Sequence, residues 1–526
     1  MNGENQLRYV GLYAAATPNK PAVIMAESGQ TLSYLQLHDF AMKMVNLYDD
    51  LGLGYGEHVA YLIENSIYCP ALQCGAHYAG QYYTFINTRL TDAEVLYIIE
   101  DCDAKVVVLS EKYSHPVLIA AIQALPLRPI VLILGESNIE GVVSLHTKLQ
   151  SYSTQVNRPL LEGNEMLYSA GTTGKPKGIK PEMSGLPLGS TEIIATQIEK
   201  AFAVHADSVY LSPAPYYHAA PIKWCRGVLA LGGTVVLMEK FEAEKALRTI
   251  ERYRVTHSQW VPTMFHRLLD LPLELRQQYD YSSLKVVIHA AAPCPVPTKQ
   301  KMIDWWGPIL YEYYGSTEQI GMTMSNTQHW LDHLGTVGRA IYGVIHILDD
   351  DGQELATGEI GHVYFSDSAR FSYHKDAAKT QEAYNVRGWA NVGDIGYLDH
   401  DGFLYLTDRK SNMIISGGVN IYPQETENVL IQHPTVMDVA VIGIPHEDFG
   451  ESVHAVIQLY QPEQASEQLK IELDQFCRRH ISSLKCPRSY EFRLELPREP
   501  SGKLLKRLLR DEYRSVLQLQ PNGALT

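Results

Sequence analysis

Continuous runs of apolar, mostly β-branched residues recur along the first part of the chain, each bounded by glycine, proline or charge. A strand that is apolar on both faces is buried on both faces, as in a parallel sheet covered by helices. Longer helical stretches separate these runs, so the pattern predicts an α/β fold with layered helices and mostly parallel sheets over about the first 400 residues. The runs are Lys105 to Leu109, Ile130 to Leu134, Thr234 to Met238 and Lys285 to Ile288.

The character of the sequence changes near Gly388. From there to Tyr405 the chain is rich in Gly and Asp, which predicts turns between short antiparallel strands. A smaller α+β domain is expected beyond Arg409, joined to the rest by a short hinge because no linker-like segment intervenes. Its expected elements are a strand at Met413 to Ile415, a helix with Pro423 in its first turn, strands at Asp438 to Ile444 and His454 to Leu459, and a helix capped by Ser466 with Leu469, Leu473 and Phe476 on one face.

Composition excludes several classes of protein. The 526 residues are 45 % hydrophobic and 20 % charged, which is typical of a globular chain and not of a disordered one. A net charge of −15 disfavours nucleic-acid partners. No apolar run is long enough to span a membrane, and the ends show neither a secretory leader nor a peroxisomal signal. The seven cysteines lack CxxC spacing, which indicates reduced thiols, so we expect a cytoplasmic multidomain protein.

The segment Tyr168 to Gly178, with the sequence YSAGTTGKPKG, concentrates small, hydroxyl-bearing and basic residues. Glycines permit close approach of the backbone, and hydroxyls and lysines donate to oxygen, so the segment predicts a polyphosphate-binding loop. It is not a Walker loop, because only two residues separate Gly171 from Gly174 and Pro176 follows the lysine. The expected phosphate-binding residues are Ser169, Gly171, Thr172, Thr173, Gly174, Lys175 and Lys177.

With this loop the chain resembles the acyl-adenylate-forming enzymes, which include acyl-CoA synthetases, the adenylation domains of peptide synthetases and beetle luciferase. The resemblance implies a large domain, residues 1–409, with the acyl pocket and the nucleotide site, and a mobile domain, residues 410–526, with the catalytic lysine. Further segments that carry it are PYYHAAP from Pro215, AAAP from Ala290, YEYYGSTE from Tyr311, GWANVGD from Gly388, Asp408-Arg409 and PSGK from Pro500.

For the nucleotide, the resemblance implies stacking of adenine on Tyr314, an α-phosphate contact for Thr317 and a Mg²⁺ contact for Glu318. The chemistry agrees, because a hard cation prefers carboxylate and phosphate oxygens, and a carboxylate such as Asp394 can accept from both ribose hydroxyls. The implied adenine and ribose set is Ala291, Ala292, Pro293, Tyr314, Gly315, Asp394 and Arg409. The implied acyl pocket contains Tyr217, His218, Trp260 and Gly315.

Lys503 resembles the family's catalytic lysine. Adenylation brings a carboxylate against an anionic α-phosphate, and one ammonium between them screens the repulsion and orients the attack. The neighbouring Lys506, Arg507 and Arg510 have helical spacing and predict a solvated basic face. Ser411 occupies the hinge position, where the family usually has Asp or Lys.

The acceptor is expected to be free CoA, because no carrier domain follows the lysine loop. Gly417 and Gly418 resemble the segment beside the pantetheine tunnel, and Lys485 and Arg488 are candidate contacts for the acidic end of CoA.

The sequence thus predicts an AMP-forming acid–CoA ligase that uses ATP, Mg²⁺ and CoA. Trp224, Trp260 and the tyrosines near His218 suggest a large apolar acid, with fatty, aryl and steroid or bile-type acids all open. The rivals are transfer to a carrier protein, a luciferase-like monooxygenase and a catalytically dead acyl- or nucleotide-binding module. A small carboxylic acid, ATP and CoA are the expected partners, nucleic acid is not, and a homodimer is the candidate assembly.

Overall fold

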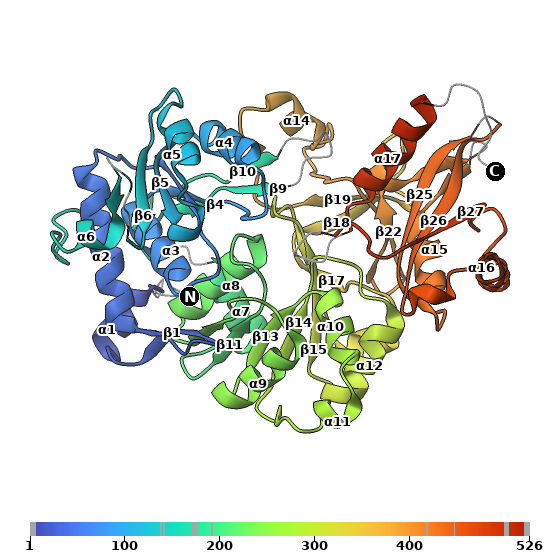
Figure 1. The fold of residues 1–526 in the computed structure, drawn as a ribbon, viewed down its shortest axis with the longest axis horizontal. Helices are drawn as coiled ribbons and strands as arrows, with labels where there is room; N and C mark the ends of the chain where they lie inside the picture. Colours follow the sequence, from blue (N-terminus) through green and yellow to red (C-terminus); the bar gives the residue numbers. More distant parts are fainter. Residues whose placement is uncertain are drawn as a thin grey trace.

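The computed structural model describes residues 7–136, 139, 142–169, 176–190, 193–416, 419–446, 448–498 and 504–519. A large N-terminal part carries the blue to yellow segments of Figure 1, and a smaller C-terminal part, orange to red, lies at its side. The fold class predicted from the sequence, an α/β protein with a large N-terminal and a smaller C-terminal domain, is confirmed.

Two sheets with parallel centres organise the large part. In the nine-stranded sheet the six central strands pair in parallel, and antiparallel strands close both edges. Its strands, in spatial order, are β17 (Arg339–Tyr342), β16 (Met322–Asn326), β15 (Leu310–Gly315), β14 (Val286–His289), β13 (His257–Trp260), β11 (Val209–Ser212), β12 (Thr234–Leu237), β1 (Pro21–Met25) and β2 (Thr31–Ser33).

The six-stranded sheet is parallel at every pairing. In spatial order it contains β7 (Val143–Ser144), β6 (Ile130–Leu134), β5 (Ala104–Ser110), β3 (His58–Leu62), β4 (Tyr82–Phe85) and β8 (Asn164–Glu165). The predicted apolar runs fall on β5, β6, β12 and β14, so the prediction of doubly buried strands is confirmed.

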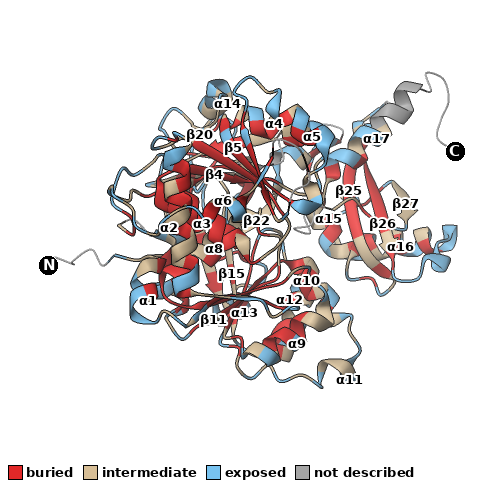
Figure 2. Ribbon diagram, turned by 60° about the vertical axis from the view of Figure 1, so that its left-hand side comes forward, coloured by how far each residue is buried: buried red, intermediate tan, exposed pale blue. Residues whose placement is uncertain are grey.

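Helices cover both faces of both sheets, which explains why these strands are apolar on both sides. Val106 and Val108 of β5 face a core between the two sheets, whereas Val107 between them faces an outer core. Val235 and Val236 of β12 divide in the same way. Figure 2 shows the resulting bands of buried residues inside the large part.

The helices between the two sheets are α2 (Tyr34–Asp50), α3 (Tyr68–Ala79), α7 (Ile193–Phe202) and α8 (Ala219–Ala230). Helix α3 is buried from Cys69 to Ala79. It packs so closely on α2 that a Cβ added at Gly75 would lie 2.6 Å from the Cβ of Met44. The outer layers are α9 (Ala243–Tyr253), α10 (Pro262–Leu269) and α12 (Val296–Trp306) on one side and α4 (Asp92–Asp101) and α5 (Pro116–Gln123) on the other.

Shorter elements complete the large part. A three-stranded sheet joins β9 (Leu167–Ser169), β10 (Lys177–Lys180) and β20 (Ser372–Tyr373). An antiparallel sheet contains β18 (Val344–Leu348), β19 (Gly361–Ser366), β21 (Asp394–Leu398) and β22 (Leu404–Arg409), which confirms the predicted antiparallel turn region. The other helices are α1 (Val10–Ala16), α6 (Leu145–Leu149), α11 (Leu273–Arg276), α13 (Thr327–Asp332) and α14 (Ala377–Glu382).

The C-terminal part has its own sheet and its own buried cores. The sheet contains β24 (Val419–Ile421), β23 (Ile414–Ser416), β26 (Gly450–Leu459), β25 (Val436–His446) and β27 (Ser489–Arg493), and the helices are α15 (Pro423–Leu430), α16 (Glu467–His480) and α17 (Lys506–Leu519). The predicted elements are present, and the Ser466 hydroxyl caps α16 by accepting from the N–H of Leu469 at 3.2 Å. Cys477 rather than Phe476 completes the buried stripe of α16.

All seven cysteines are free. None of the helices within the described residues is long and apolar enough to cross a membrane.

Candidate active site

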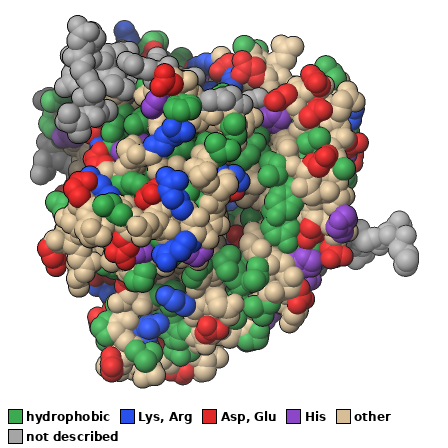
Figure 3. Space-filling view, turned by 90° about the vertical axis from the view of Figure 1, so that its right-hand side faces the viewer, with side chains coloured by type: hydrophobic (Ala, Val, Ile, Leu, Met, Phe, Trp, Pro, Cys, Tyr) green, Lys and Arg blue, Asp and Glu red, His purple; other side chains and the backbone are tan. Residues whose placement is uncertain are grey.

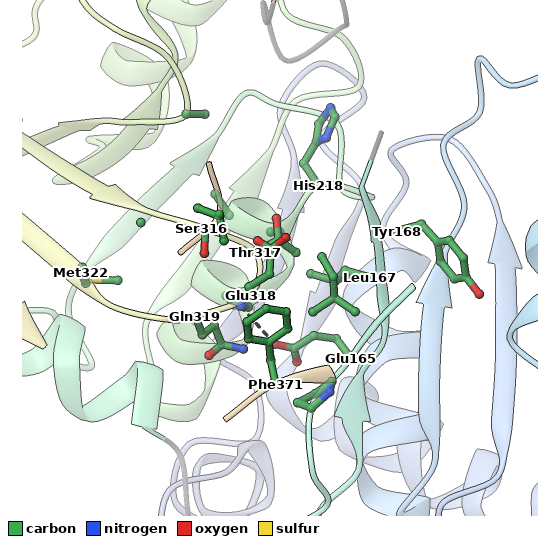
Figure 4. A pocket seen from close by; sticks show the side chains of 18 of the residues that line it. Glu165, Leu167, Tyr168, His218, Ser316, Thr317, Glu318, Gln319, Met322 and Phe371 are labelled. Carbon is green, nitrogen blue, oxygen red and sulfur yellow. Dashed lines mark ion pairs between the residues drawn. The ribbon is translucent and has the colours of Figure 1, made fainter. Parts of the chain in front are cut away.

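A cleft of about 1960 Å³ opens between the two parts of the molecule. Its walls come from β9 and β10, the start of α8, the end of β15, β20 and the start of α17. Figure 4 shows Leu167, His218, Thr317 and Glu318 around the same cavity, although they come from three separate segments of the chain. The fold thus gathers motifs that are far apart in sequence at one place.

The expected phosphate loop connects β9 to β10. Gly171, Thr172, Thr173, Gly174 and Lys175 lie outside the described residues, as does the side chain of Ser169.

Lys177, at the start of β10, lines the cleft, and its ammonium lies 5.6 Å from the centre of the Tyr373 ring. Burial and the neighbouring Lys379 lower the pKa of Lys177. Both effects disfavour the charged ammonium, and an anion bound beside it would favour the charge.

Thr317 and Glu318 follow β15 in a turn that lines the cleft. A Glu318 carboxylate oxygen accepts a hydrogen bond from the Tyr373 hydroxyl at 2.9 Å. Burial and the nearby Glu318 raise the pKa of Tyr373, so this hydroxyl stays protonated and remains a donor. Sequence reasoning missed Tyr373, because only the fold brings β20 beside the turn after β15.

Asp394, Tyr314 and Arg409 form one cluster. The Tyr314 hydroxyl donates to Asp394 Oδ2 at 2.6 Å, and Arg409 Nε donates to Asp394 Oδ1 at 3.0 Å. Asp394 and Arg409 are register partners at the ends of β21 and β22, which fixes their separation. Asp394 raises the pKa of Arg409, although burial of the guanidinium opposes this rise, so the charged form of Arg409 is favoured. The cluster offers the carboxylate and guanidinium expected of a ribose clamp.

The expected adenine loop follows β14. Ala291 lines the cleft together with Gly315, and it adopts a left-handed backbone conformation with φ of 74°. A residue with a Cβ in this region is uncommon, so the loop is held in a strained shape beside the cleft. Ala292 and Pro293 do not belong to the described cleft lining.

Tyr217 and His218 line the cleft just before α8. The buried Nε2 of His218 has no hydrogen-bond partner among the described residues. Burial, with Arg89 adding, lowers the pKa of His218 to about 4, so the ring is neutral at physiological pH. Trp260 touches the cleft but is 1 % exposed, and its indole N–H donates to Ser258 at 2.8 Å.

Three charged side chains that sequence reasoning missed also line the cleft: Glu165, Lys223 and Arg226. Arg226 Nη1 donates to Glu165 at 2.8 Å, and the Lys223 ammonium lies 3.8 Å from the same carboxylate. The sequence contains a signal for two of them, because Lys223 and Arg226 are three residues apart in an otherwise apolar helix, and this spacing places both on one face.

The described residues on either side of the lysine loop reach the cleft from the C-terminal part. Lys503 itself lies outside the described residues, but Arg498 before it and Leu505 after it both line the cleft. Arg498 is held by Asp438, with its Nε 2.6 Å from Oδ2. Ser411 also lines the cleft, and its carbonyl accepts a hydrogen bond from Arg510.

The prediction of a solvated basic face on α17 is wrong for Lys506. Its side chain is only 8 % exposed, and its ammonium lies 2.8 Å from Glu427 and 3.8 Å from Asp408. Lys506 shares a helical face with the buried Leu509, so packing of α17 carries it inward. Arg507, on the exposed side, faces Asp511 at 3.4 Å.

Among the expected CoA residues, the structure describes Lys485 and Arg488, and both lie apart from the cleft. Gly417 and Gly418 are outside the described residues. Lys485 pairs with Glu425, and the Arg488 guanidinium lies 3.9 Å from the centre of the Phe449 ring. Neither side chain is part of the described cleft lining.

The side of the molecule seen in Figure 3 carries a row of Lys and Arg side chains among apolar and acidic ones.

Comparisons with known proteins agree with this geometry. The AMP-binding enzyme family matches residues 12–372, and the AMP-binding enzyme C-terminal domain matches residues 425–503. The chain is 31 % identical over 514 residues to the long-chain-fatty-acid–CoA ligase FadD13 of Mycobacterium tuberculosis, with 96 % of this chain and 97 % of the relative covered. It is 30 % identical over 515 residues to the fatty acid–[acyl-carrier-protein] ligase ScoC of Streptomyces coeruleorubidus, with 95 % of each covered.

Another relative is the 3-[(3aS,4S,7aS)-7a-methyl-1,5-dioxo-octahydro-1H-inden-4-yl]propanoyl:CoA ligase of Rhodococcus jostii, 30 % identical over 507 residues, with 93 % of this chain and 95 % of the relative covered. Among solved structures, ATP-bound MatB from Rhodopseudomonas palustris has a TM-score of 0.83 at 27 % identity, with 97 % and 99 % of the two chains covered.

The matches confirm the predicted family and fold class. They also confirm the predicted class of enzyme, an AMP-forming acid–thiol ligase, and its use of ATP, Mg²⁺ and CoA. With both family domains matched in order and a cleft between the two parts that carry them, the chain belongs to the AMP-binding enzyme family.

Proposed function

We propose that this enzyme joins a large, mainly apolar carboxylic acid to CoA through an acyl-AMP intermediate. The observation that carries the proposal is one cleft lined by the Glu318 carboxylate and by Arg409, whose guanidinium donates a hydrogen bond to Asp394. The same cleft is lined by Ile198, Phe202 and Trp224, whose apolar side chains suit an apolar acid. Relatives named for a fatty acid and for a fused-ring propanoate support acids of this size.

In the first step a carboxylate oxygen of the acid attacks the α-phosphorus of ATP, and the bond to the bridging oxygen of pyrophosphate breaks. Asp394 accepts from the ribose hydroxyls, Thr317 donates to the α-phosphate, and Lys503 stands between the two anions. Glu318 presents a carboxylate, which suits the Mg²⁺ that accompanies ATP. When bound, Mg²⁺ neutralises charge on the phosphates.

In the second step the thiol sulfur of CoA attacks the acyl carbon, AMP leaves, and the thiol proton passes to solvent. One pocket then serves two reactions, so the part with Lys503 must move aside between them. We place the two domains at residues 1–409 and 410–526, with the hinge at Ser411. The carbonyl of Ser411 bonded to Arg510 and the Lys506 ion pairs near it support a joint at this place.

The test is release of pyrophosphate from ATP·Mg²⁺ with a panel of fatty, aryl and fused-ring acids, with and without CoA. We expect release to need both an acid and Lys503, and CoA to convert the product to a thioester. Replacing one well-placed charge stabiliser costs on the order of 10²–10³ in rate. Release without any acid, or equal release by Lys503→Ala, would contradict the proposal.

A carrier protein is the second candidate acceptor, because the relative ScoC is named as an acyl-carrier-protein ligase. Thioester formation with phosphopantetheinylated carrier protein but not with CoA would favour it.

A homodimer and a cytoplasmic location belong to the same proposal. The seven free cysteines support a reducing compartment. Sedimentation velocity tests the dimer, and cell fractionation tests the location.

A further inference from the structure

A charged cluster lies in the wall of the cleft, which also contains the apolar side chains that we propose receive the acid. Helix α8 contributes Lys223 and Arg226, and strand β8 contributes Glu165. One oxygen of Glu165 accepts from Arg226 Nη1 at 2.8 Å and from the Tyr83 hydroxyl at 3.2 Å. The Arg226 guanidinium therefore already balances the charge of this carboxylate.

Lys223 is different from its two neighbours. Its ammonium lies 3.8 Å from Glu165 Oε1, which is beyond hydrogen-bond distance. The Glu318 carboxylate acts on this ammonium through electrostatics, and no described residue lies within hydrogen-bond distance of it. The side chain is 15 % exposed, and the surface that it exposes belongs to the cleft. Three N–H donors thus stand at the cavity wall without a bonded acceptor in the described protein.

An ammonium in this position is costly for the fold. Burial lowers the pKa of Lys223, with the carboxylate of Glu165 opposing, which is the response of a desolvated cation. The wall of the same cleft also contains the apolar side chains of Leu167, Trp224 and Phe202. Hydrogen bonds that replace lost hydration stabilise a buried charge, and the contents of the cleft can supply the acceptor that the described protein does not place within hydrogen-bond distance.

We propose that Lys223 selects the acid substrate by donating hydrogen bonds to an oxygen acceptor on the body of the acyl group, away from the carboxylate that is activated. This inference rests on the proposed function and narrows its substrate class. The preferred acids are apolar skeletons that carry a keto or a second carboxylate oxygen, in place of plain hydrocarbon acids. Arg226 and Glu165 hold the cluster in place, and only Lys223 contacts the substrate.

The experiment compares acids that differ only in the acceptor. One series is decanoate, 9-oxodecanoate and decanedioate, and a second is 4-phenylbutanoate and 4-oxo-4-phenylbutanoate. The kcat/KM of pyrophosphate release is measured on the full-length enzyme for wild type, Lys223→Met and Lys223→Gln. Lys200→Met is the matched control, because Lys200 is an exposed lysine on the neighbouring helix α7 and does not line the cleft.

In wild type we expect at least one acceptor-bearing acid to exceed its plain partner in kcat/KM by tenfold or more. A hydrogen bond from a charged group contributes about 10- to 100-fold, so Lys223→Met should reduce that preference by this factor. The plain acids should keep or gain activity, because the variant removes a desolvated charge. A keto acid and a dicarboxylic acid distinguish a dipolar from an anionic acceptor. Lys200→Met should leave every ratio unchanged.

An equal loss of kcat/KM for plain and acceptor-bearing acids in both Lys223→Met and Lys223→Gln overturns the inference. It would mean that Lys223 binds the reacting carboxylate or only supports the fold. A wild type that shows no preference for any acceptor-bearing acid overturns it as well, while the ligase activity stands. If wild type releases no pyrophosphate with any acid, the proposed function fails, and this inference fails with it.

Discussion

The variant Lys506→Met removes the Lys506 ammonium and should show how much the buried ion pairs near the hinge stabilise the C-terminal part. Lys506, Glu427 and Asp408 meet with side-chain exposures of 8, 7 and 5 %, and Lys506 is 2.8 Å from Glu427 and 3.8 Å from Asp408. In Lys506→Met two buried carboxylates remain without their cation, and breaking a buried ion pair from one side costs ~3–5 kcal/mol. One kcal/mol lowers the Tm of a small domain by roughly 4–8 °C. We therefore expect the transition of the C-terminal part to fall by at least ~10 °C.

The loss of stability in Lys506→Met should also depend on pH. Burial raises the pKa of Glu427, Lys506 opposes this rise and Asp408 adds to it. A carboxyl group with a higher pKa in the folded protein binds more protons when folded, so it costs stability above that pKa and the cost disappears as the pH falls toward the unfolded value. Removing Lys506 raises the folded pKa further. The stability deficit of Lys506→Met relative to wild type should thus shrink as the pH is lowered from about 8 toward 5.

Differential scanning calorimetry of the full-length chain resolves the transitions. The double variant Lys506→Met/Glu427→Gln should recover most of the loss, because the amide oxygen of Gln can still accept from the N–H of Val441, which lies 2.6 Å from Glu427 Oε1. The control is Arg507→Met, which removes an exposed neighbour on the same helix and should leave the transition in place. A Lys506→Met transition unchanged from wild type, or a deficit that grows on acidification, would refute the reasoning.

Three further predictions concern the chemistry. Lys503→Ala should slow pyrophosphate release on the order of 10²–10³-fold but leave thioester formation from added acyl-AMP nearly intact. Single-turnover assays measure the two steps separately, and an equal loss of rate in both would contradict this prediction. Asp394→Ala should weaken AMP binding about 10- to 100-fold in calorimetric titration, since it removes the acceptor beside Arg409, and unchanged affinity would exclude a ribose contact. Tyr373→Phe removes a neutral hydrogen-bond donor to Glu318, which contributes ~1 kcal/mol. Half-maximal pyrophosphate release should therefore need about fivefold more Mg²⁺. An effect on the KM of the acid alone would contradict a role of Tyr373 in positioning Glu318.

The sequence predicted the layered sheets because burial on both faces leaves a local mark. Val106, Val107 and Val108 have to be apolar whichever side they face, since both sides are covered. Caps are local too, and the Ser466 hydroxyl needs only the N–H three residues away. The family motifs are contiguous for the same reason: each one is a single turn or strand end, so its residue types can be recognised without the fold.

The side chains that the sequence did not identify all depend on contacts between distant segments. The Tyr373 hydroxyl reaches Glu318 across 55 positions, and Glu165 meets Arg226 across 61. Lys506 looked solvated because a basic residue on an amphipathic helix usually is, and only the docking of α17 shows that Glu427 and Asp408 meet it. Composition and spacing therefore determined the layers, the motifs and the class of chemistry. The tertiary structure alone decided which charges are buried, because burial and electrostatic pairing depend on distances that neighbouring residues in the sequence do not set.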